Sequence, residues 1–331
     1  MAKIAILGFG TVGSGVLEVV RRNAASIARR VGEPVEVKYI LDVRDFSASP
    51  DAALFTDNID TILNDPEVKV VVETIGGTRF ALPYVRKCLA SGRSVCTSNK
   101  EMVAGYGAEL LALAKAHNAA FLFEASVGGG TPIITPMHQC LAANHISRIC
   151  GIVNGDRNFM LTKMKRENMG FDEALRIAQQ LGYAETKDPG DDVDGRDACR
   201  KIAILASLAC GHHVYPDNIP ARGIRDITVA DIKAAEQMDS AIKLIAWYDE
   251  NAGGGAERHP PDHIEQGRRH GDDDRSEECD QKRRPLLCFN IHHSYFVYCC
   301  MRRAMYLPTM SNSRFTTDPT SIRQKFVCSN V

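Results

Sequence analysis

The sequence contains no long apolar run and no excess of charge of either sign. Its 331 residues include 40 Lys and Arg against 41 Asp and Glu, which leaves a formal net charge of −1 at pH 7. This balance gives no reason to expect a nucleic acid or an anionic membrane surface as a partner. The most apolar stretch, residues 286–300, is interrupted by Asn290, His292, His293 and Ser294. It falls short of the roughly 18 uninterrupted apolar residues that span a bilayer, so we expect no membrane partner.

Targeting and metal-binding patterns are also lacking. The first residues lead from a short apolar run directly into a glycine-rich turn, which is not typical of a secretory signal peptide. The 11 cysteines are scattered, with no CxxC pair and no zinc-ligand spacing. In a chain of this length, such cysteine usage is typical of free thiols in a reducing compartment. We therefore expect a cytoplasmic location.

A glycine-rich turn follows the first predicted strand, residues 3–7. The turn matches the pattern GxGxxG and consists of Gly8, Phe9, Gly10, Thr11, Val12 and Gly13. A helical pattern with Val16, Leu17 and Val20 comes next. In this strand–turn–helix context the pattern predicts dinucleotide binding. The first glycine permits the tight turn, the second lets the backbone approach a pyrophosphate, and the third allows the helix to pack closely on the strand.

The end of the second predicted strand, residues 35–41, carries two side chains that influence cofactor preference. An acid at this place favours the free 2′-hydroxyl of NAD, whereas an arginine accommodates the 2′-phosphate of NADP. Asp42 and Arg44 both lie within reach. NAD and NADP therefore both stay open, with Arg44 favouring NADP slightly.

Strands and helices alternate along the first part of the chain. The predicted strands are 68–74, 94–97 and 120–124, and the predicted helices are 81–91 and 108–117. This alternation predicts an α/β fold with a parallel, doubly wound sheet of the Rossmann type. Ligands of such sheets bind beyond the carboxyl ends of the strands. Thr74, Ser98 and Lys100 follow strands at that edge, so we expect them at the cofactor.

Acidic and basic side chains gather in the middle of the chain. Residues 182–185 (GYAE) precede residues 192–201 (DVDGRDACRK). Asp197 and Lys201 are four residues apart, so on a helix they would share one face, with the acid toward the N-terminus. Such a pair can bind a polar substrate and move a proton. The alternative is a surface ion pair on a capped helix, since exposed pairs are common and individually weak.

In combination, these motifs resemble the homoserine dehydrogenase family. They are the glycine turn 8–13, Ser98-Asn99-Lys100, residues 124–132 (EASVGGGTP), residues 151–155 (GIVNG) and the block 182–201. The resemblance covers about residues 1–246. It implies a dinucleotide-binding domain over residues 1–133 and an α+β substrate and dimerisation domain over residues 134–246. It also implies reversible NAD(P)-dependent conversion of L-homoserine to L-aspartate 4-semialdehyde in threonine and methionine biosynthesis, carried out by a homodimer.

The resemblance implies roles for individual residues. Lys201 would be the proton donor and acceptor, and Asp197 would order the reacting hydroxyl or a water. The substrate pocket would contain Glu185, which binds the substrate ammonium, together with Asp192, Gly182 and Lys100. Lys100 would also lie beside the nicotinamide. The family binds a sodium ion near residues 124–132, and by position its ligands would be Glu124, Val127, Gly129 and Thr131; we expect this ion to be structural.

Three features depart from the family pattern. Asp156 and Arg157 stand where the family usually has small threonines, which keeps open a dehydrogenase of another small amino or hydroxy acid. The loop after Glu185 is one residue longer than usual, so Asp191 is an alternative to Asp192. No GPGAG-like loop follows residue 246, and the charge-dense residues 257–284 show neither helical nor strand periodicity, which predicts disorder.

We interpret residues 247–331 as an aberrant tail that arises from a shifted reading frame. The reason is an abrupt change of composition: alanine is frequent before residue 247 and nearly absent after it. A catalytically impaired or non-catalytic chain that only binds a dinucleotide is therefore a further alternative.

Overall fold

The N-terminal part is built on a six-stranded parallel sheet. The computed structural model describes residues 1–182, 193–238 and 240–252. The strands are β1 (Ala2–Leu7), β2 (Val35–Leu41), β3 (Phe55–Thr56), β4 (Val68–Glu73), β5 (Ser94–Thr97) and β6 (Phe121–Leu122). Their order is β3-β2-β1-β4-β5-β6, and every neighbouring pair is parallel. The predicted doubly wound α/β fold is confirmed, with the order reversing between β1 and β4, where such folds bind their ligands.

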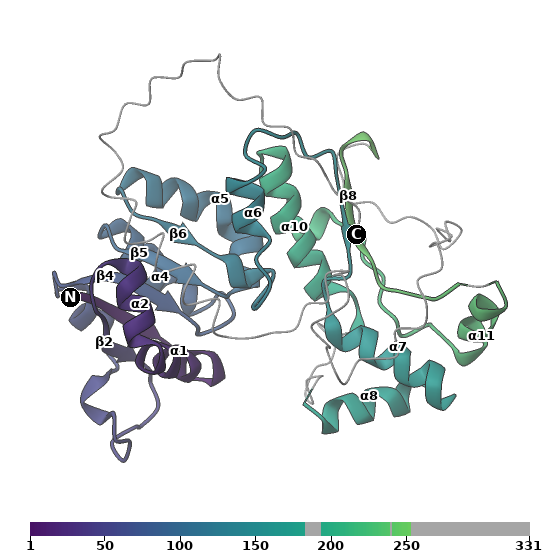
Figure 1. Ribbon diagram of the computed structural model, residues 1–331, viewed down its shortest axis with the longest axis horizontal. Helices are drawn as coiled ribbons and strands as arrows, with labels where there is room; N and C mark the ends of the chain where they lie inside the picture. The colour runs from purple at the N-terminus through teal and green to yellow at the C-terminus, as the bar shows by residue number, and fades with distance from the viewer. Residues whose placement is uncertain (183–192, 239, 253–331) are drawn as a thin grey trace.

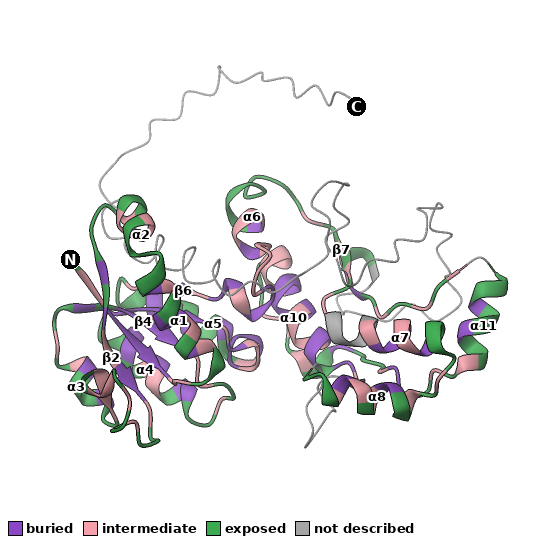
Figure 2. Cartoon of the chain, turned by 60° about the horizontal axis from the view of Figure 1, so that its bottom comes forward, coloured by how far each residue is buried: buried purple, intermediate pink, exposed green. Residues whose placement is uncertain are grey.

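Helices cover both faces of this sheet (Figure 1). They are α1 (Thr11–Arg22), α2 (Ala24–Val31), α3 (Ile59–Leu63), α4 (Ala81–Ala90) and α5 (Lys100–Ala116). Successive residues of a strand point to opposite faces. Accordingly, Ile4 and Ile6 pack with α1 and α2, whereas Ala5 and Leu7 pack with α3, α4 and α5. The central strands are apolar almost throughout because both of their faces are buried (Figure 2).

Two predicted elements differ in extent from the structure. The predicted helix 108–117 begins eight residues earlier, at Lys100, because the side chain of Asn99 accepts a hydrogen bond from the Met102 N–H and caps the helix. The predicted strand 120–124 is shortened to β6. A 3-10 helix starts at Glu124 instead, since the carboxylate of Glu124 turns toward the backbone of residues 133–135.

The second part of the chain is smaller and mixed α+β. Its helices are α6 (Ile134–Gln139), α7 (Gly155–Glu167), α8 (Phe171–Gln180), α10 (Arg196–Cys210) and α11 (Val229–Gln237). Its strands, β7 (Arg148–Gly151) and β8 (Ala246–Asp249), form an antiparallel pair. The 3-10 helices of the two parts are η1 (Ala52–Leu54), η2 (Glu124–Ser126), η3 (Pro216–Asn218) and η4 (Glu250–Ala252).

The end of the second part differs from the expected boundary. The boundary predicted after residue 246 falls inside β8, which continues to Asp249 and pairs with β7 along its whole length. Residues 253–331, which contain most of the predicted tail, lie outside the described residues. Within the part of the chain that is described, no helix has the length and apolar character needed to cross a bilayer.

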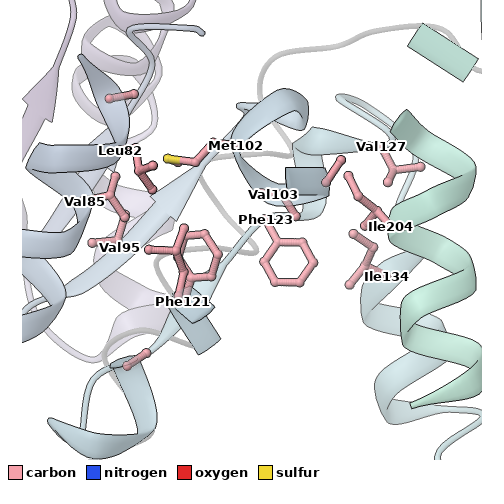
Figure 3. Packing of buried hydrophobic residues seen from close by; sticks show 14 of the residues in the cluster. Leu82, Val85, Val95, Met102, Val103, Phe121, Phe123, Val127, Ile134 and Ile204 are labelled. Atoms are coloured by element: carbon pink, nitrogen blue, oxygen red, sulfur yellow. The ribbon is translucent and has the colours of Figure 1, made fainter. Parts of the chain in front are cut away.

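Helix α10 joins the two parts through one continuous core. It packs against α5 on the sheet side and against β8 on the other side. Figure 3 shows Ile204 of α10 facing Val127, with Ile134 and Phe123 close by. All four side chains are at most 9% exposed. Because the helix is packed on both sides, it is held at a definite position beyond the sheet. Its first two turns carry the predicted catalytic residues Asp197 and Lys201.

Candidate active site

The glycine turn between β1 and α1 has the geometry of a pyrophosphate site. Gly8 adopts φ +91°, in the left-handed region that favours glycine. A Cβ on Gly13 would lie 2.0 Å from the Gly8 carbonyl oxygen, so only glycine allows α1 to approach this closely. A Cβ on Gly10 would meet nothing within 4 Å, which leaves open space beside the turn. No side chain caps α1, whose first residues are Thr11 and Val12, so its N-terminal dipole faces that space.

Thr74 fastens the turn to the neighbouring strand end. Its Oγ1 donates to the carbonyl oxygens of Gly8, at 2.8 Å, and Leu7, at 3.1 Å. The predicted cofactor residue Thr74 therefore holds the backbone of the glycine turn against the end of β4. The structure thus places the glycine turn between β1 and α1, as the strand–turn–helix pattern predicts, and joins it to the end of β4.

Asp42 and Arg44 form a bidentate pair at the end of β2. The Arg44 Nε and Nη2 donate to Asp42 Oδ1 and Oδ2 at 2.9 and 2.8 Å. Asp42 Oδ2 also accepts the Phe9 N–H of the glycine turn at 2.7 Å. The Arg44 hydrogen bonds lower the pKa of Asp42 from its ordinary value of 3.8 to about 2, with burial opposing them. The Asp42 side chain is 8% exposed and that of Arg44 is 58% exposed, so the arginine is the group that reaches solvent.

Lys100, Asp197 and Lys201 meet at the carboxyl edge of the sheet. The Lys100 Nζ donates to Asp197 Oδ1, and the Lys201 Nζ lies 3.0 Å from Asp197 Oδ2. Lys100 is the first residue of α5, while Asp197 and Lys201 stand on the first turn and a half of α10. Ser98 precedes Lys100 in the same loop and is half-buried. Asp197 and Lys201 have the helical spacing that the sequence predicts. Lys100, the third residue of the group, comes from the dinucleotide-binding domain.

Burial and charge act in opposite directions on Asp197. The residue is 2% exposed, and burial alone would raise the pKa of its carboxyl. The positive charges of Lys201 and Lys100, with hydrogen bonds from Lys100 and Asn154, outweigh burial and hold that pKa well below its ordinary range. Asp197 is therefore an ionised carboxylate that two lysines share. The interpretation as a surface ion pair is wrong for this residue, because a surface pair would leave the acid in water.

Two further groups near Asp197 were not assigned a role from the sequence. Asn154 donates through Nδ2 to Asp197 Oδ2 at 2.9 Å, and the Lys201 Nζ donates to the Val153 carbonyl oxygen at 2.8 Å. Both lie just after β7, in the segment GIVNG. The Asn-Gly pair between a strand and a helix is the signal that could have indicated Asn154. These contacts fix Lys201 on the same side of α10 as Asp197.

The loop before α10 is held by a close backbone approach. The Ile224 N–H donates to the Val193 carbonyl oxygen at 2.9 Å, and a Cβ on Gly223 would lie 2.1 Å from that oxygen. Arg225 is paired with Asp194 beside this contact. Gly195, with φ +94°, follows as the N-cap residue of α10. Glycine at 223 therefore helps to place the first turn of α10, a role that its sequence context did not reveal.

The remaining predicted substrate residues belong to a segment that the structure does not describe. Glu185, Asp192 and the alternative Asp191 lie outside the described residues. Gly182 follows α8 with φ +77° and stands at the entrance to that segment. Of the residues predicted to bind the substrate or to act on it, the structure describes Gly182, Lys100, Asp197 and Lys201.

Glu124 makes contacts that bear on the predicted sodium site. Its carboxylate accepts the N–H groups of Ile133, Ile134 and Thr135 at 2.7 to 2.8 Å, together with the Thr135 hydroxyl at 2.5 Å. The carboxylate thus caps α6 and has no acceptor position left for a cation. In the described part of the chain, no group of three or more His, Cys, Asp or Glu could hold a metal ion. The carboxylate of Glu124 does not fit the role of a sodium ligand, which leaves carbonyl oxygens of Glu124, Val127 and Gly129 and the oxygens of Thr131.

Comparison with known proteins points to one family. A family model described as homoserine dehydrogenase matches residues 132–266, and one described as homoserine dehydrogenase, NAD binding domain, matches residues 8–124. A homoserine dehydrogenase of Synechocystis sp. is 41% identical over 254 residues, which is 76% of this chain and 58% of that protein. The chain therefore spans somewhat more than half the length of this curated relative.

Solved structures agree with the sequence relatives. A homoserine dehydrogenase from Thiobacillus denitrificans has a TM-score of 0.71 and 40% identity, with 75% of this chain and 58% of that one covered. A mutant of a hyperthermophilic archaeal homoserine dehydrogenase, in complex with NADPH, has a TM-score of 0.63 and 30% identity. That match covers 75% of this chain and 79% of the archaeal chain.

Proposed function

The chain belongs to the homoserine dehydrogenase family, and we propose that it interconverts L-homoserine and L-aspartate 4-semialdehyde with NAD(P). One observation carries the proposal. A buried, ionised Asp197 is joined to Lys100 of the dinucleotide-binding domain and to Lys201 of the second domain, at the carboxyl edge of a parallel sheet. That edge is where a nicotinamide would lie in a fold of this type.

The residues supply the proton chemistry of the reaction. The nicotinamide cofactor, when bound, accepts the hydride in alcohol oxidation or supplies it in aldehyde reduction. In aldehyde reduction, the Lys201 ammonium gives a proton to the developing alkoxide and becomes an amine; in alcohol oxidation, that amine takes the proton of the substrate hydroxyl and becomes the ammonium again. Asp197 and the Val153 carbonyl oxygen hold the Lys201 Nζ in one orientation. Lys100 adds positive charge on the cofactor side, where negative charge develops on the substrate oxygen during reduction.

The proposal is tested by an assay of the purified chain. Homoserine with NADP⁺ or NAD⁺ should give reduced cofactor, measured by its absorbance, and aspartate 4-semialdehyde should oxidise reduced cofactor. A panel of other small hydroxy and amino acids tests the alternative raised by Asp156 and Arg157. Binding of reduced cofactor without turnover of any of these compounds would contradict the proposal and favour a non-catalytic chain.

For the cofactor we propose a preference for NADP, carried by Arg44. Both carboxylate oxygens of Asp42 accept from Arg44, and one also accepts from Phe9, so a ribose hydroxyl would have to displace the arginine. An exposed guanidinium suits a 2′-phosphate instead. We expect Arg44→Ala to raise the KM for NADP about tenfold, which corresponds to the loss of one charge-assisted hydrogen bond. The KM for NAD should rise by less than about twofold, because NAD has no 2′-phosphate for Arg44 to bind.

Arg86→Ala is the matched control for this variant. Arg86 is also an exposed arginine in a bidentate pair, with Glu109, through Nε and Nη2 at 2.6 and 2.8 Å, but it stands on α4. Its loss should leave both KM values unchanged. Equal effects of Arg44→Ala on the two cofactors would show that Arg44 does not read the 2′-phosphate.

Sodium and the homodimer stay predictions of the family resemblance. The contacts of the Glu124 carboxylate leave only carbonyl and hydroxyl oxygens for the ion, and no step of the proposed chemistry depends on it.

A further inference from the structure

Glu73 is a buried carboxyl at the end of the central strand β4. It is 0% exposed and stands between Leu7 of β1 and Thr97 of β5 in the sheet register. Burial raises the pKa of the Glu73 carboxyl above its ordinary value, and hydrogen bonds to neighbouring groups oppose the rise. Placing a carboxyl at a buried strand end is costly unless it makes hydrogen bonds. An apolar residue would fill this position more favourably if packing were its only role.

The carboxylate of Glu73 connects two loops at the ligand edge. Its Oε1 accepts the N–H groups of Ile75 and Gly76 at 2.7 and 3.4 Å, in the loop after β4. Its Oε2 accepts the hydroxyl of Thr97 at 2.5 Å, at the end of β5. The hydrogen bonds from Ile75, Gly76 and Thr97 favour the ionised form of Glu73, and a carboxylate can only accept, so the Thr97 hydroxyl donates toward it.

Thr97 passes this constraint on to Asn99. With its hydrogen turned toward Glu73, the Thr97 Oγ1 accepts the Asn99 N–H at 2.9 Å. The Asn99 side chain donates through Nδ2 to the Gly77 carbonyl oxygen at 2.6 Å and accepts the Met102 N–H at 3.0 Å. The chain of bonds thus returns to the loop after β4 and forms a closed ring. Asn99 is also the cap of α5, whose first residue is Lys100.

We propose that Glu73 is a positioning residue that, through Thr97 and Asn99, holds Lys100 against Asp197. Its catalytic consequence rests on the proposed function, since Lys100 matters for turnover only if the chain is a dehydrogenase. Glu73 itself does not touch Asp197. It determines where α5 begins, and thereby where the Lys100 Nζ lies relative to the carboxylate on α10.

The test compares two substitutions at Thr97 with one at Ser94. Thr97→Val removes the hydroxyl, and Thr97→Ser restores it. Ser94→Ala removes another buried hydroxyl of β5, at the opposite edge of the sheet, where Ser94 Oγ accepts the Ala120 N–H at 3.1 Å. Lys100 is labelled with an amine-acetylating reagent, and the rate is followed by mass spectrometry of the Lys100 peptide. Melting temperature and kcat are measured on the same samples.

We expect Thr97→Val to lower kcat about tenfold, within the roughly 10²-fold that a misplacement of about 1 Å can cost, and to label Lys100 roughly three to ten times faster than wild type because Asp197 then holds its ammonium less firmly. Thr97→Ser and Ser94→Ala should behave as wild type. Glu73→Gln makes the same test without a change in β5. The glutamine amide would donate to Thr97 Oγ1 and would compete with the Asn99 N–H for that acceptor. The double variant Glu73→Gln/Thr97→Val should be no slower than either single variant, as expected for residues of one network.

Two results would overturn the positioning role. One is a Lys100 labelling rate in Thr97→Val and Glu73→Gln no higher than in Ser94→Ala. The other is a kcat of Thr97→Ser as low as that of Thr97→Val. If the wild-type chain turns over no homoserine, the proposed function fails, whereas the labelling rates still decide whether Glu73 positions Lys100.

Discussion

Replacing Lys201 with alanine should lower kcat by about 10²–10⁴-fold, the usual contribution of a positioned acid–base group. The Nζ of Lys201 is held by Asp197 and the Val153 carbonyl oxygen. Its side chain is only 17% exposed, so a water molecule would not readily take over the proton transfer. The KM for the cofactor should change little, because the role proposed for Lys201 is at the substrate hydroxyl. The measurement is steady-state kinetics with homoserine and each cofactor. A wild type no faster than Lys201→Ala would contradict the catalytic role of this lysine.

Lys163→Ala provides the matched control for Lys201→Ala. Lys163 pairs with Glu167 four residues away, at 2.5 Å, so it reproduces a helical acid–lysine spacing of the same kind on α7. Lys163 and Glu167 are both more exposed than Lys201 and Asp197. Its loss should leave kcat within about twofold of wild type, since pairs of this kind contribute little. The difference between the two variants isolates the effect of position from that of losing a paired lysine.

Replacing Asp197 with asparagine should lower kcat by about 10²-fold or more and also destabilise the fold. Asparagine keeps the shape but leaves the ammonium groups of Lys100 and Lys201 close together without the carboxylate between them. Breaking a buried ion pair costs about 3–5 kcal/mol. Because Lys100 is 39% exposed and can turn to water, we expect about 2 kcal/mol in the free energy of unfolding. Denaturant titration measures the loss, with Glu109→Gln as the control for an exposed pair.

The stability effect of Asp197 has a defined pH dependence. Its pKa in the folded chain lies below the ordinary value of 3.8, so its contribution is fully present above that pH and is lost as the pH falls through the folded-state pKa. The difference in unfolding free energy between wild type and Asp197→Asn should therefore be constant from about pH 5 to 8 and shrink below about pH 4. A difference that already declines near pH 6 would contradict the ionised state assigned to Asp197. For the same reason, the acid limb of the activity profile should not come from this residue.

The dinucleotide-binding domain could be predicted closely because its signals are local. Strand β5 spans Ser94–Thr97, the same residues that the pattern predicts, and the glycine turn stands where GxGxxG requires it. The predicted start of α5 was eight residues late, although the side chain of Asn99 accepts the Met102 N–H and is a local capping signal. The further bond from Asn99 to the Gly77 carbonyl oxygen joins another loop and could not be predicted. The boundary after residue 246 fell inside β8 because the change of composition does not coincide with the end of the strand.

In the candidate site, too, contacts between distant segments of the chain could not be predicted from the sequence. The spacing of Asp197 and Lys201 could be predicted to share a helix face, since four residues make about one turn. Lys100 was expected near the cofactor, yet its bond to Asp197, 97 residues away, depends on how α5 and α10 pack. Asn154 belongs to the motif GIVNG, but the sequence indicates no role for it. Its hydrogen bond to Asp197 requires β7 to end beside α10, which depends on the tertiary structure.

The sequence by itself determined the class of fold, the place of the glycine turn and the helix face that Asp197 and Lys201 share, because each depends on residues that are neighbours along the chain. Only the tertiary structure decided that Asp197 is buried between two lysines from different domains and is therefore ionised. It also decided that the Glu124 carboxylate caps a helix instead of facing a cation. Burial and charge are properties of what surrounds a side chain in space, and distant segments of the chain supply most of those surroundings.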